Sequence, residues 1–122
     1  MKLENYQGSN YSNYKISKSN IFFPKNNEEI FQIINFANKK NLKILTVGSS
    51  LSWYDTIFNT NNIIINLNNY NKTFLFDEKN GILTVSSFYK IYEVLDKINK
   101  YGWSIYSIPG SLDVTIGGCI SN

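Results

Sequence analysis

The segment Pro109-Gly-Ser-Leu-Asp-Val-Thr-Ile-Gly-Gly-Cys-Ile-Ser-Asn122, read together with Val47-Gly-Ser-Ser-Leu-Ser-Trp-Tyr-Asp55, decides the fold of this chain. Each segment is a loop of small residues that follows an apolar stretch. Glycine has no Cβ and tolerates positive φ, and serine adds a hydroxyl group that can donate a hydrogen bond. Several amide groups that point to one place form a concave anion site. We therefore expect both loops to hold one bulky ligand that carries a pyrophosphate.

The first loop has two interpretations. In the first, the amides from Gly48 to Trp53 and the serine hydroxyls wrap a diphosphate. In the second, Gly-Ser-Ser is an ordinary turn at the exit of a strand. Trp53 and Tyr54 are large for a loop, so we expect them to cover something. Asp55 is expected to fix the loop by accepting backbone N–H bonds.

The second loop is also open to two interpretations. Pro109-Gly110 suits a type II turn. Gly117-Gly118 would let a planar ring or a phosphate lie against the main chain, but the same pair is typical of a tight bend. Thr115 is expected in a strand, and Asp113 is expected to be a solvated carboxylate. Cys119 is expected to be a small buried apolar residue rather than a nucleophile, because the chain has no histidine to activate it.

The composition of the 122 residues fits one domain or part of one. The net charge is +3 and every basic residue is lysine, spread along the chain rather than clustered, which argues against nucleic-acid binding. A single cysteine excludes an internal disulfide and a cysteine-based zinc site, and we expect no metal site. No apolar run approaches the roughly 20 residues that span a bilayer, and the start of the sequence lacks the apolar stretch of a secretory signal. We therefore expect a cytoplasmic protein without a transmembrane segment, with attachment to a membrane surface as an alternative. The nineteen asparagines indicate an AT-rich coding bias.

The pattern of the chain predicts an α+β fold, with helices packed on mixed β-sheets. Asn26 caps a helix, and Glu29 stands in capping-box position. Asn80-Gly81 supplies positive φ for a hairpin. In a second helix, Glu93 and Lys97 form an i,i+4 pair. The expected elements of the first half are an arm or loop over 1–20, a strand over 21–23 ended by Pro24, the first helix, a buried strand over 43–47 and a strand over 63–67. The second half is expected to form hairpin strands over 73–76 and 82–85 and a helix over 88–100 that is ended by Gly102. The apolar face of the first helix is expected to consist of Ile30, Ile33, Ile34 and Ala37, and that of the second of Phe88, Ile91, Leu95 and Ile98.

Other ligand and catalytic motifs are absent from the sequence. There is no Gly-x-Gly-x-x-Gly run, no Gly-x4-Gly-Lys-Ser/Thr phosphate loop and no histidine for a triad. The sequence therefore indicates a segment that holds a ligand and leaves the catalytic residues unknown.

The two loops, in this order and at this separation, resemble the FAD-binding domain of the vanillyl-alcohol oxidase and p-cresol methylhydroxylase (PCMH) superfamily. The resemblance covers residues 6–122 and includes the Pro24-x-x-x-x-Glu29-Ile30 entry to the helix. Gly102-Trp103, Ile108-Pro-Gly-Ser and Val114-Thr-Ile-Gly-Gly-Cys-Ile-Ser-Asn are most similar to the decaprenylphosphoryl-ribose oxidase branch of sugar oxidases. The resemblance implies the N-terminal portion of a PCMH-type domain over 21–122, incomplete at its C-terminus, with an N-terminal arm over 1–20.

The resemblance also implies which residues contact FAD, although this chain departs from the pattern of the branch. Gly48, Ser52 and Asp55 match its upstream loop, whereas Ser50 stands for a glycine and Trp53-Tyr54 stand for Tyr-Gly. Leu51 replaces the residue that carries a covalent flavin link in some members, so FAD is expected to be non-covalent as far as this segment shows. The cofactor-binding candidates are Val47, Gly48, Ser49, Ser50, Leu51, Ser52, Trp53, Tyr54, Asp55, Gly110, Ser111, Thr115, Ile116, Gly117, Gly118 and Asn122.

The activity implied is that of an FAD-dependent oxidoreductase acting on CH–OH groups. Hydride would pass from an alcohol carbon of a sugar, or of a polyprenyl-phosphate sugar, to flavin N5. The alternatives are an aldonolactone oxidase of the same fold and a truncated, non-catalytic remnant. The fragment alone is expected to be inactive. A small-molecule or lipid-linked sugar is the expected substrate, a reductase that completes an epimerisation is an expected partner, and no nucleic acid is expected.

Overall fold

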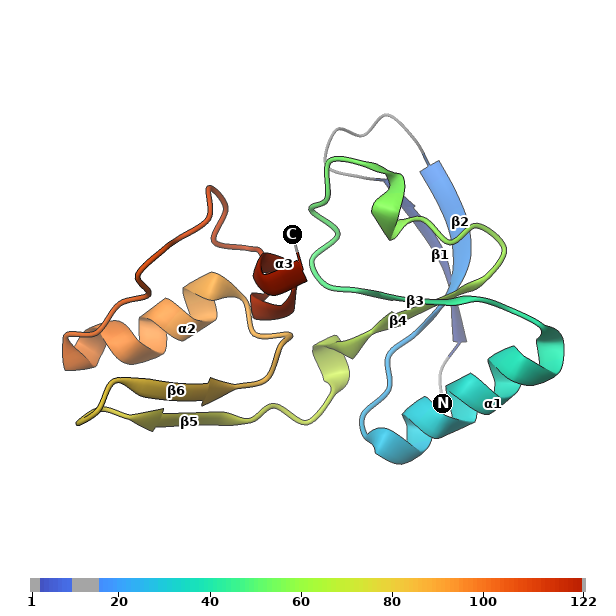
Figure 1. Ribbon diagram of the computed structural model, residues 1–122. Coiled ribbons are helices and arrows are strands. Elements are labelled where there is room, and N and C mark those ends of the chain that lie inside the picture. The colour runs from blue at the N-terminus through green and yellow to red at the C-terminus, as the bar shows by residue number, and fades with distance from the viewer. Residues whose placement is uncertain (1–2, 10–15, 122) are drawn as a thin grey trace. The chain divides into compact units, whose positions relative to one another are not determined.

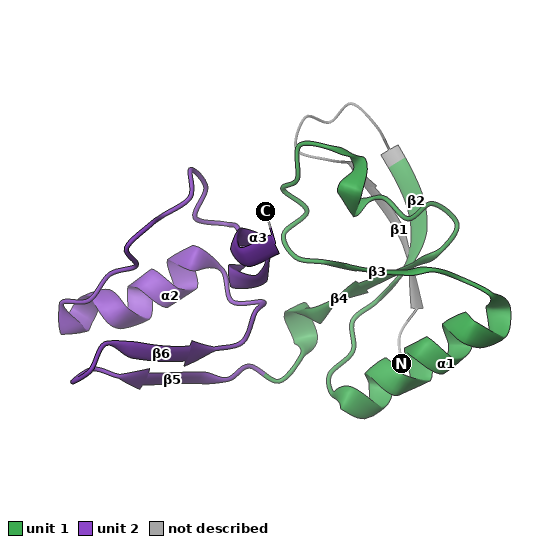
Figure 2. Cartoon of the chain, viewed as in Figure 1, with its two compact units in different colours: residues 1–71 green, residues 72–122 purple. Residues whose placement is uncertain are grey.

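The computed structural model describes residues 3–9 and 16–121, with side chains described from Ser17 onward. The chain divides into two compact units, residues 1–71 and residues 72–122 (Figure 2). We call them unit 1 and unit 2 and describe each by itself. Both combine helices with β-structure, as the sequence predicts.

Unit 1 is a four-stranded mixed sheet with one long helix against it (Figure 1). Its strands are β1 (Leu3–Ser9), β2 (Ile16–Phe22), β3 (Ile44–Val47) and β4 (Ile63–Asn66), in the order β1-β2-β4-β3. β1 runs antiparallel to β2, and the other pairs are parallel. The prediction of an arm or loop over 1–20 is wrong for the described part, because β1 pairs with β2 along its whole length.

The helix α1 (Asn27–Lys40) begins as predicted. The Asn26 side chain accepts a hydrogen bond of 3.0 Å from the Glu29 amide, and the Glu29 carboxylate accepts one of 2.9 Å from the Lys25 amide. Asn41 then ends the helix in the left-handed conformation with φ of 51°. Of the predicted apolar face, Ile33 and Ala37 are fully buried, whereas Ile34 is partly exposed.

Alternation along β4 gives unit 1 an apolar cluster on each face of its sheet. Ile63 and Ile65 pack with Phe22 and α1 on one face. Ile64 packs with Ile21 and Val47 on the other. Only Val47 of β3 is buried, so the prediction of a fully buried strand there is wrong; β3 is the edge strand, and the buried position in the sheet belongs to β4.

Unit 2 is a β-hairpin covered by one helix (Figure 1). Its hairpin strands are β5 (Phe74–Asp77) and β6 (Ile82–Val85), and its helices are α2 (Ile91–Ile98) and α3 (Ile116–Ser121). Val94 and Ile98 of α2 pack with Tyr89 against the inner face of the hairpin. The predicted stripe omits Val94, which is fully buried, and includes Leu95, which is only half-buried.

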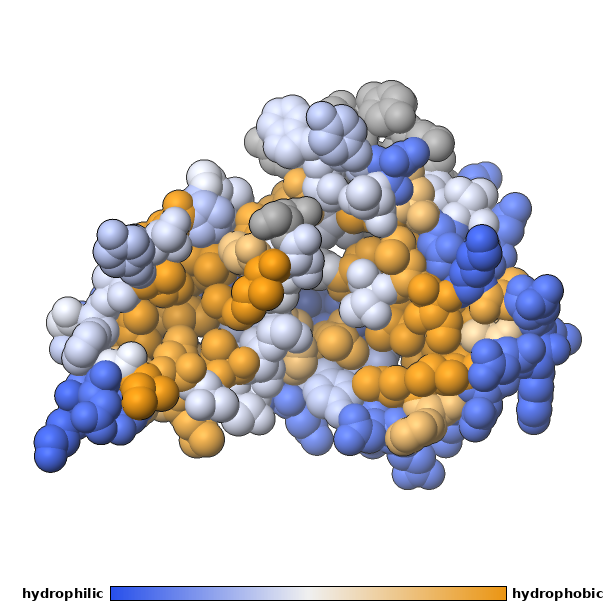
Figure 3. All heavy atoms as spheres, in the orientation of Figure 1, coloured by the Kyte–Doolittle hydropathy of each residue, from blue (hydrophilic) through white to orange (hydrophobic). Residues whose placement is uncertain are grey.

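The hairpin turn is built as predicted at Gly81 but not at Asn80. Gly81 has φ of 68°, whereas Asn80 is not among the positive-φ residues. Instead, the side-chain amide of Asn80 donates to the Asp77 carboxylate at 2.7 Å, which with the amides of Lys79 and Asn80 lowers the pKa of that carboxyl. The turn is covered by hydrophilic side chains, and hydrophobic ones reach the surface beside it (Figure 3).

Glu93 anchors the start of α2 instead of pairing with Lys97 along the helix. Its carboxylate accepts 2.8 Å and 3.0 Å hydrogen bonds from the Lys90 amide and the Lys72 ammonium group. Burial acts to raise the pKa of the Glu93 carboxyl, but these partners outweigh it, and the pKa lies below its ordinary value of 4.5. The Lys97 ammonium group lies 5.3 Å from the centre of the Phe74 ring.

Replacing Glu93 with glutamine should make the free energy of unfolding depend less on pH in the acidic range. The Glu93 carboxyl has a lower pKa in the folded than in the unfolded protein, so it stabilises the fold at pH values above its unfolded pKa. This stabilisation disappears as the pH falls through the folded pKa. Glutamine keeps an oxygen for the Lys90 amide but loses the charge, so we expect about 1 kcal/mol lower stability near pH 7. Urea unfolding between about pH 7 and pH 3 checks this. If the difference in unfolding free energy between the parent and Glu93→Gln stays constant across that pH range, the prediction is contradicted.

Of the described helices, none combines the length and the apolar character that a membrane crossing requires.

Candidate functional site

The first candidate segment leaves the sheet of unit 1 at the carboxyl end of β3. Ligands of open sheets with parallel strands bind beyond this end of the strands. The neighbouring strand β4 ends in register with β3, since Val47 is paired with Asn66. The half-buried residues from Gly48 to Ser52 therefore emerge from the edge of the sheet at which a ligand is expected.

The backbone of this loop turns at Ser50, which has φ of 57°. This left-handed conformation suits glycine, so the structure gives a physical reason for the glycine that the resembled branch has here. Left-handed residues are also part of the backbone concavities that bind anions. The Ser52 hydroxyl lies 2.8 Å from the Thr56 hydroxyl at the start of a short 3-10 helix over Asp55–Ile57.

Asn66 is a loop-supporting residue that the sequence analysis missed. Its side-chain amide donates to the Gly48 carbonyl at 3.2 Å, while its side-chain oxygen accepts from the Asn68 amide at 2.9 Å. The side chain is buried at the end of β4, where it fixes the start of the loop. The available signal was a single polar residue that ends an apolar strand and is followed by Leu67.

Trp53 and Tyr54 follow Ser52 and are exposed, with exposed fractions of 64% and 76%. Large exposed aromatic rings beside a small-residue loop can stack on a planar ligand. Asp55 begins the 3-10 helix, and its carbonyl accepts a 2.9 Å hydrogen bond from the Phe58 amide.

Replacing Ser50 with valine should test the loop's backbone. A β-branched residue at positive φ is strained by about 1–2 kcal/mol relative to glycine, so we expect the free energy of unfolding of the valine variant to be lower than that of the Ser50→Gly variant by this amount. Glycine at the same position adopts this φ freely, and the Ser50→Gly variant is the matched control. Equal stability of the valine and glycine variants in urea unfolding would contradict the left-handed turn.

The second candidate segment in unit 2 is held by backbone hydrogen bonds to the first residues of α2 and to Tyr89, which precedes it. The Ile91 amide donates to Val114 at 3.0 Å, and the Tyr92 amide donates to Leu112 at 3.1 Å. In the reverse direction, Ile116 donates to Tyr89 at 2.8 Å. Thr115 pairs with Lys90 as a single antiparallel bridge rather than as part of a strand.

The amides of the Gly117-Gly118 pair donate to acceptors within the chain. Gly117 donates to the Ser87 carbonyl at 2.6 Å, and Gly118 donates to the Thr115 hydroxyl at 3.1 Å. The Gly117-Gly118 pair therefore lies in the first turn of α3, not in an open bend. A Cβ on Gly117 would lie 3.2 Å from Ser87, so glycine here allows close packing. The Asp113 side chain is 65% exposed, as expected, and its carboxylate lies 3.3 Å from the Lys90 ammonium group.

Gly110 differs from the glycines of α3. It is not among the positive-φ glycines, so the predicted type II turn at Pro109-Gly110 is wrong. A Cβ built on Gly110 would meet no atom within 4 Å. Neither backbone conformation nor packing requires glycine at this exposed position, which leaves room for a ligand against the main chain. Ser111 accepts a 3.3 Å hydrogen bond from the Asp113 amide, and the candidate Asn122 lies outside the described residues.

The sequence matches the model of a family described as "FAD binding domain" over residues 19–122. It is 28% identical over 116 residues to an L-gulonolactone oxidase of Scyliorhinus torazame, covering 94% of this chain and 26% of that protein. It is 26% identical over 98 residues to a putative D-arabinono-1,4-lactone oxidase of Neurospora crassa, covering 80% of this chain and 17% of that protein. This chain therefore spans about a quarter or less of the length of these relatives.

Solved structures show the same fold. A cholesterol oxidase from Brevibacterium sterolicum matches with a TM-score of 0.80 at 16% identity, over 96% of this chain and 23% of that chain. A solvent-stable cholesterol oxidase matches with a TM-score of 0.77 at 18% identity, again over 96% of this chain and 23% of that chain. At these identities the likeness concerns the fold alone.

Proposed function

Because this chain belongs to the FAD binding domain family and has the PCMH-type FAD-binding fold, we propose that it is the cofactor-holding part of an FAD-dependent oxidoreductase that acts on an aldonolactone. The domain would occupy residues 21–122. The substrate class is supported by the two lactone oxidases that resemble this chain. When bound, FAD supplies the acceptor for hydride at N5, and the protein supplies its position.

The residues of the first loop fit a diphosphate better than those of α3 do. The loop combines a left-handed residue, Ser50, with the hydroxyls of Ser49 and Ser52 at the carboxyl end of a parallel strand. In contrast, the amides of Ile116, Gly117 and Gly118 donate within the chain. We propose that residues 47–55 of unit 1 bind the diphosphate of FAD. The left-handed turn at Ser50, at the carboxyl end of a parallel strand, is the observation that carries this proposal. Within unit 2, considered by itself, we propose Gly110 and Ser111 as FAD contacts, because a Cβ on Gly110 would meet no atom within 4 Å.

A second candidate substrate is an alcohol carbon of a sugar or of a polyprenyl-phosphate sugar. The run Gly102-Trp103 followed by Val114-Thr-Ile-Gly-Gly, similar to the decaprenylphosphoryl-ribose oxidase branch, favours it. Trp103, however, has a structural role in unit 2, since its indole N–H donates to the Glu78 carbonyl at 2.9 Å and its ring lies against the position of a Gly81 Cβ. We therefore place the aldonolactone first.

Titration of the purified chain with FAD tests cofactor binding. We expect quenching of flavin fluorescence at saturation and a rise in the melting temperature that increases with the FAD concentration. FMN lacks the adenylate and the diphosphate, and is expected to bind at least about tenfold more weakly, because charge-assisted hydrogen bonds contribute roughly 1.5–3 kcal/mol. Equal affinity for FMN and FAD would contradict a diphosphate site. An unchanged melting temperature with both would support the non-catalytic remnant.

The substrate class is tested separately, in the natural polypeptide that carries this chain. Anaerobic addition of an aldonolactone should bleach the flavin absorbance faster than addition of a sugar with a free alcohol carbon. The reverse order would replace the first substrate class with the second while leaving the FAD site intact.

A further inference from the structure

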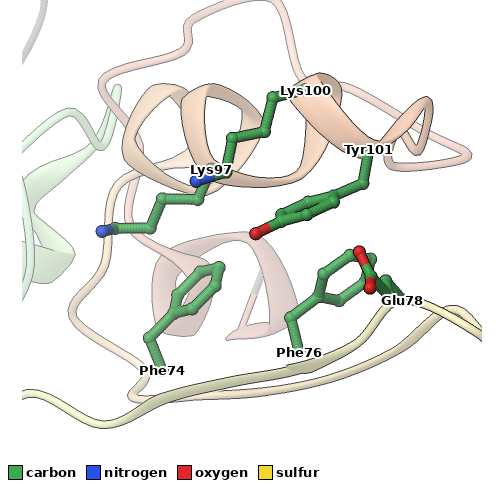
Figure 4. A pocket seen from close by; sticks show the side chains of 6 residues that line it. All are labelled: Phe74, Phe76, Glu78, Lys97, Lys100 and Tyr101. Atoms are coloured by element: carbon green, nitrogen blue, oxygen red, sulfur yellow. The ribbon is translucent and has the colours of Figure 1, made fainter.

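Unit 2 contains a pocket that lies apart from both candidate FAD segments in the sequence. It has a volume of about 370 Å³ and opens between β5 and the end of α2 with the following 3-10 turn (Figure 4). We call it the Phe74 pocket. It is lined by Phe74, Phe76, Glu78, Lys97, Lys100 and Tyr101.

Aromatic rings form the floor and one wall of the Phe74 pocket. Phe74 and Phe76 alternate with exposed residues along β5 and so share the face that is turned toward α2. The Tyr101 ring lies 5.8 Å from the Phe76 ring, centre to centre, and its hydroxyl points toward the middle of the group in Figure 4. Such a surface favours the stacking of a planar ligand.

Two ammonium groups reach over these rings from the helical side (Figure 4). Lys97 Nζ lies 5.3 Å from the centre of the Phe74 ring, and Lys100 Nζ lies 5.0 Å from that of Tyr101. Among the residues that the structure describes, the ion pairs of unit 2 involve other lysines. Glu93 pairs with Lys72, and Asp113 pairs with Lys90. The ammonium groups at the pocket therefore complement an anion.

We propose that the Phe74 pocket binds a planar aromatic carboxylate. Its ring would stack over Phe74 and Phe76, and its carboxylate would lie between Lys97 and Lys100. The volume is within the range of small-molecule pockets, roughly 300–1,000 Å³. Glu78 lies at the Phe76 end in Figure 4, which sets the carboxylate of the ligand at the lysine end, because like charges repel.

Fluorescence can report this binding from inside unit 2. Trp103 lies beside the pocket, with its ring centre 6.4 Å from that of Phe76. In the Trp53→Phe variant it is the sole tryptophan. We expect titration with 2-aminobenzoate to quench Trp103 to saturation, and added salt to weaken the binding. Lys97→Met and Lys100→Met keep the apolar stems and should each lower the affinity about fivefold, the loss expected for one exposed ion pair.

Two controls separate this site from general effects of charge and from the cofactor. Lys39→Met with Lys40→Met removes the same charge at the end of α1 and should leave the affinity unchanged. FAD at saturation should not displace 2-aminobenzoate. The proposal is overturned by non-saturable quenching, by equal affinity in the doubly substituted Lys97 and Lys100 protein, or by competition with FAD. Circular dichroism of each variant confirms that unit 2 remains folded.

Discussion

Replacing Gly81 with alanine should lower the free energy of unfolding of unit 2 by about 2–3 kcal/mol. Gly81 has φ of 68°, a conformation that costs an alanine roughly 1–2 kcal/mol. A Cβ here would also lie 2.5 Å from two carbon atoms of the Trp103 ring. The indole must therefore move, and its 2.9 Å hydrogen bond to the Glu78 carbonyl, worth about 1 kcal/mol, would be lost. Urea unfolding followed by circular dichroism measures the loss.

A double-mutant cycle with Trp103→Ala separates the two causes. Without the indole, Gly81→Ala should cost only the backbone strain of about 1–2 kcal/mol, so the two substitutions should be coupled. The matched control is Gly102→Ala, which has φ of 78° but no atom within 4 Å of the added Cβ. A full loss in Gly81→Ala that is independent of Trp103 would contradict the ring contact.

The elements that the sequence predicts well are those with local determinants. Asn26 and Glu29 specify the start of α1 through side-chain hydrogen bonds within one turn. Gly81 specifies the hairpin because its positive φ is a local requirement. The carboxyl end of β3 was located for the same reason, since an apolar strand that ends in Gly48 is visible in the sequence.

The missed elements depend on partners far away in the sequence. β1 is a polar stretch whose strand conformation depends on β2, with which it pairs along its whole length. α3 contains Gly117-Gly118, a poor helix former, and its first turn is fixed by Thr115 and Ser87. Propensity alone predicts a bend at this position, and the tertiary contacts override it.

The number of asparagines in the chain does not predict the structural roles that individual asparagines have. A coding bias explains their number but not their places. The side chain of Asn59 donates to the carbonyls of Lys43 and Ile63, at 3.0 Å and 2.7 Å. Asn61 occupies the left-handed region with φ of 60°, where asparagine is tolerated better than most residues. These residues hold the turn before β4, and Asn66 holds the candidate loop after it.

Replacing Gly110 with valine should weaken FAD binding by at least about tenfold, or roughly 1.4 kcal/mol, while leaving the stability of the FAD-free chain within about 0.5 kcal/mol of the parent. The stability should hold because Gly110 has no positive φ and a Cβ there meets no atom within 4 Å. The affinity should fall because, in the proposed site, the valine methyl groups occupy space that the cofactor needs. Flavin fluorescence titration measures the affinity, and urea unfolding without FAD measures the stability. Gly102→Ala is again the control, and it should show the opposite pattern, since its strain at φ of 78° lowers stability without a change at the cofactor. Parent-like FAD affinity in Gly110→Val would remove this segment from the cofactor site and leave residues 47–55 as its proposed anchor.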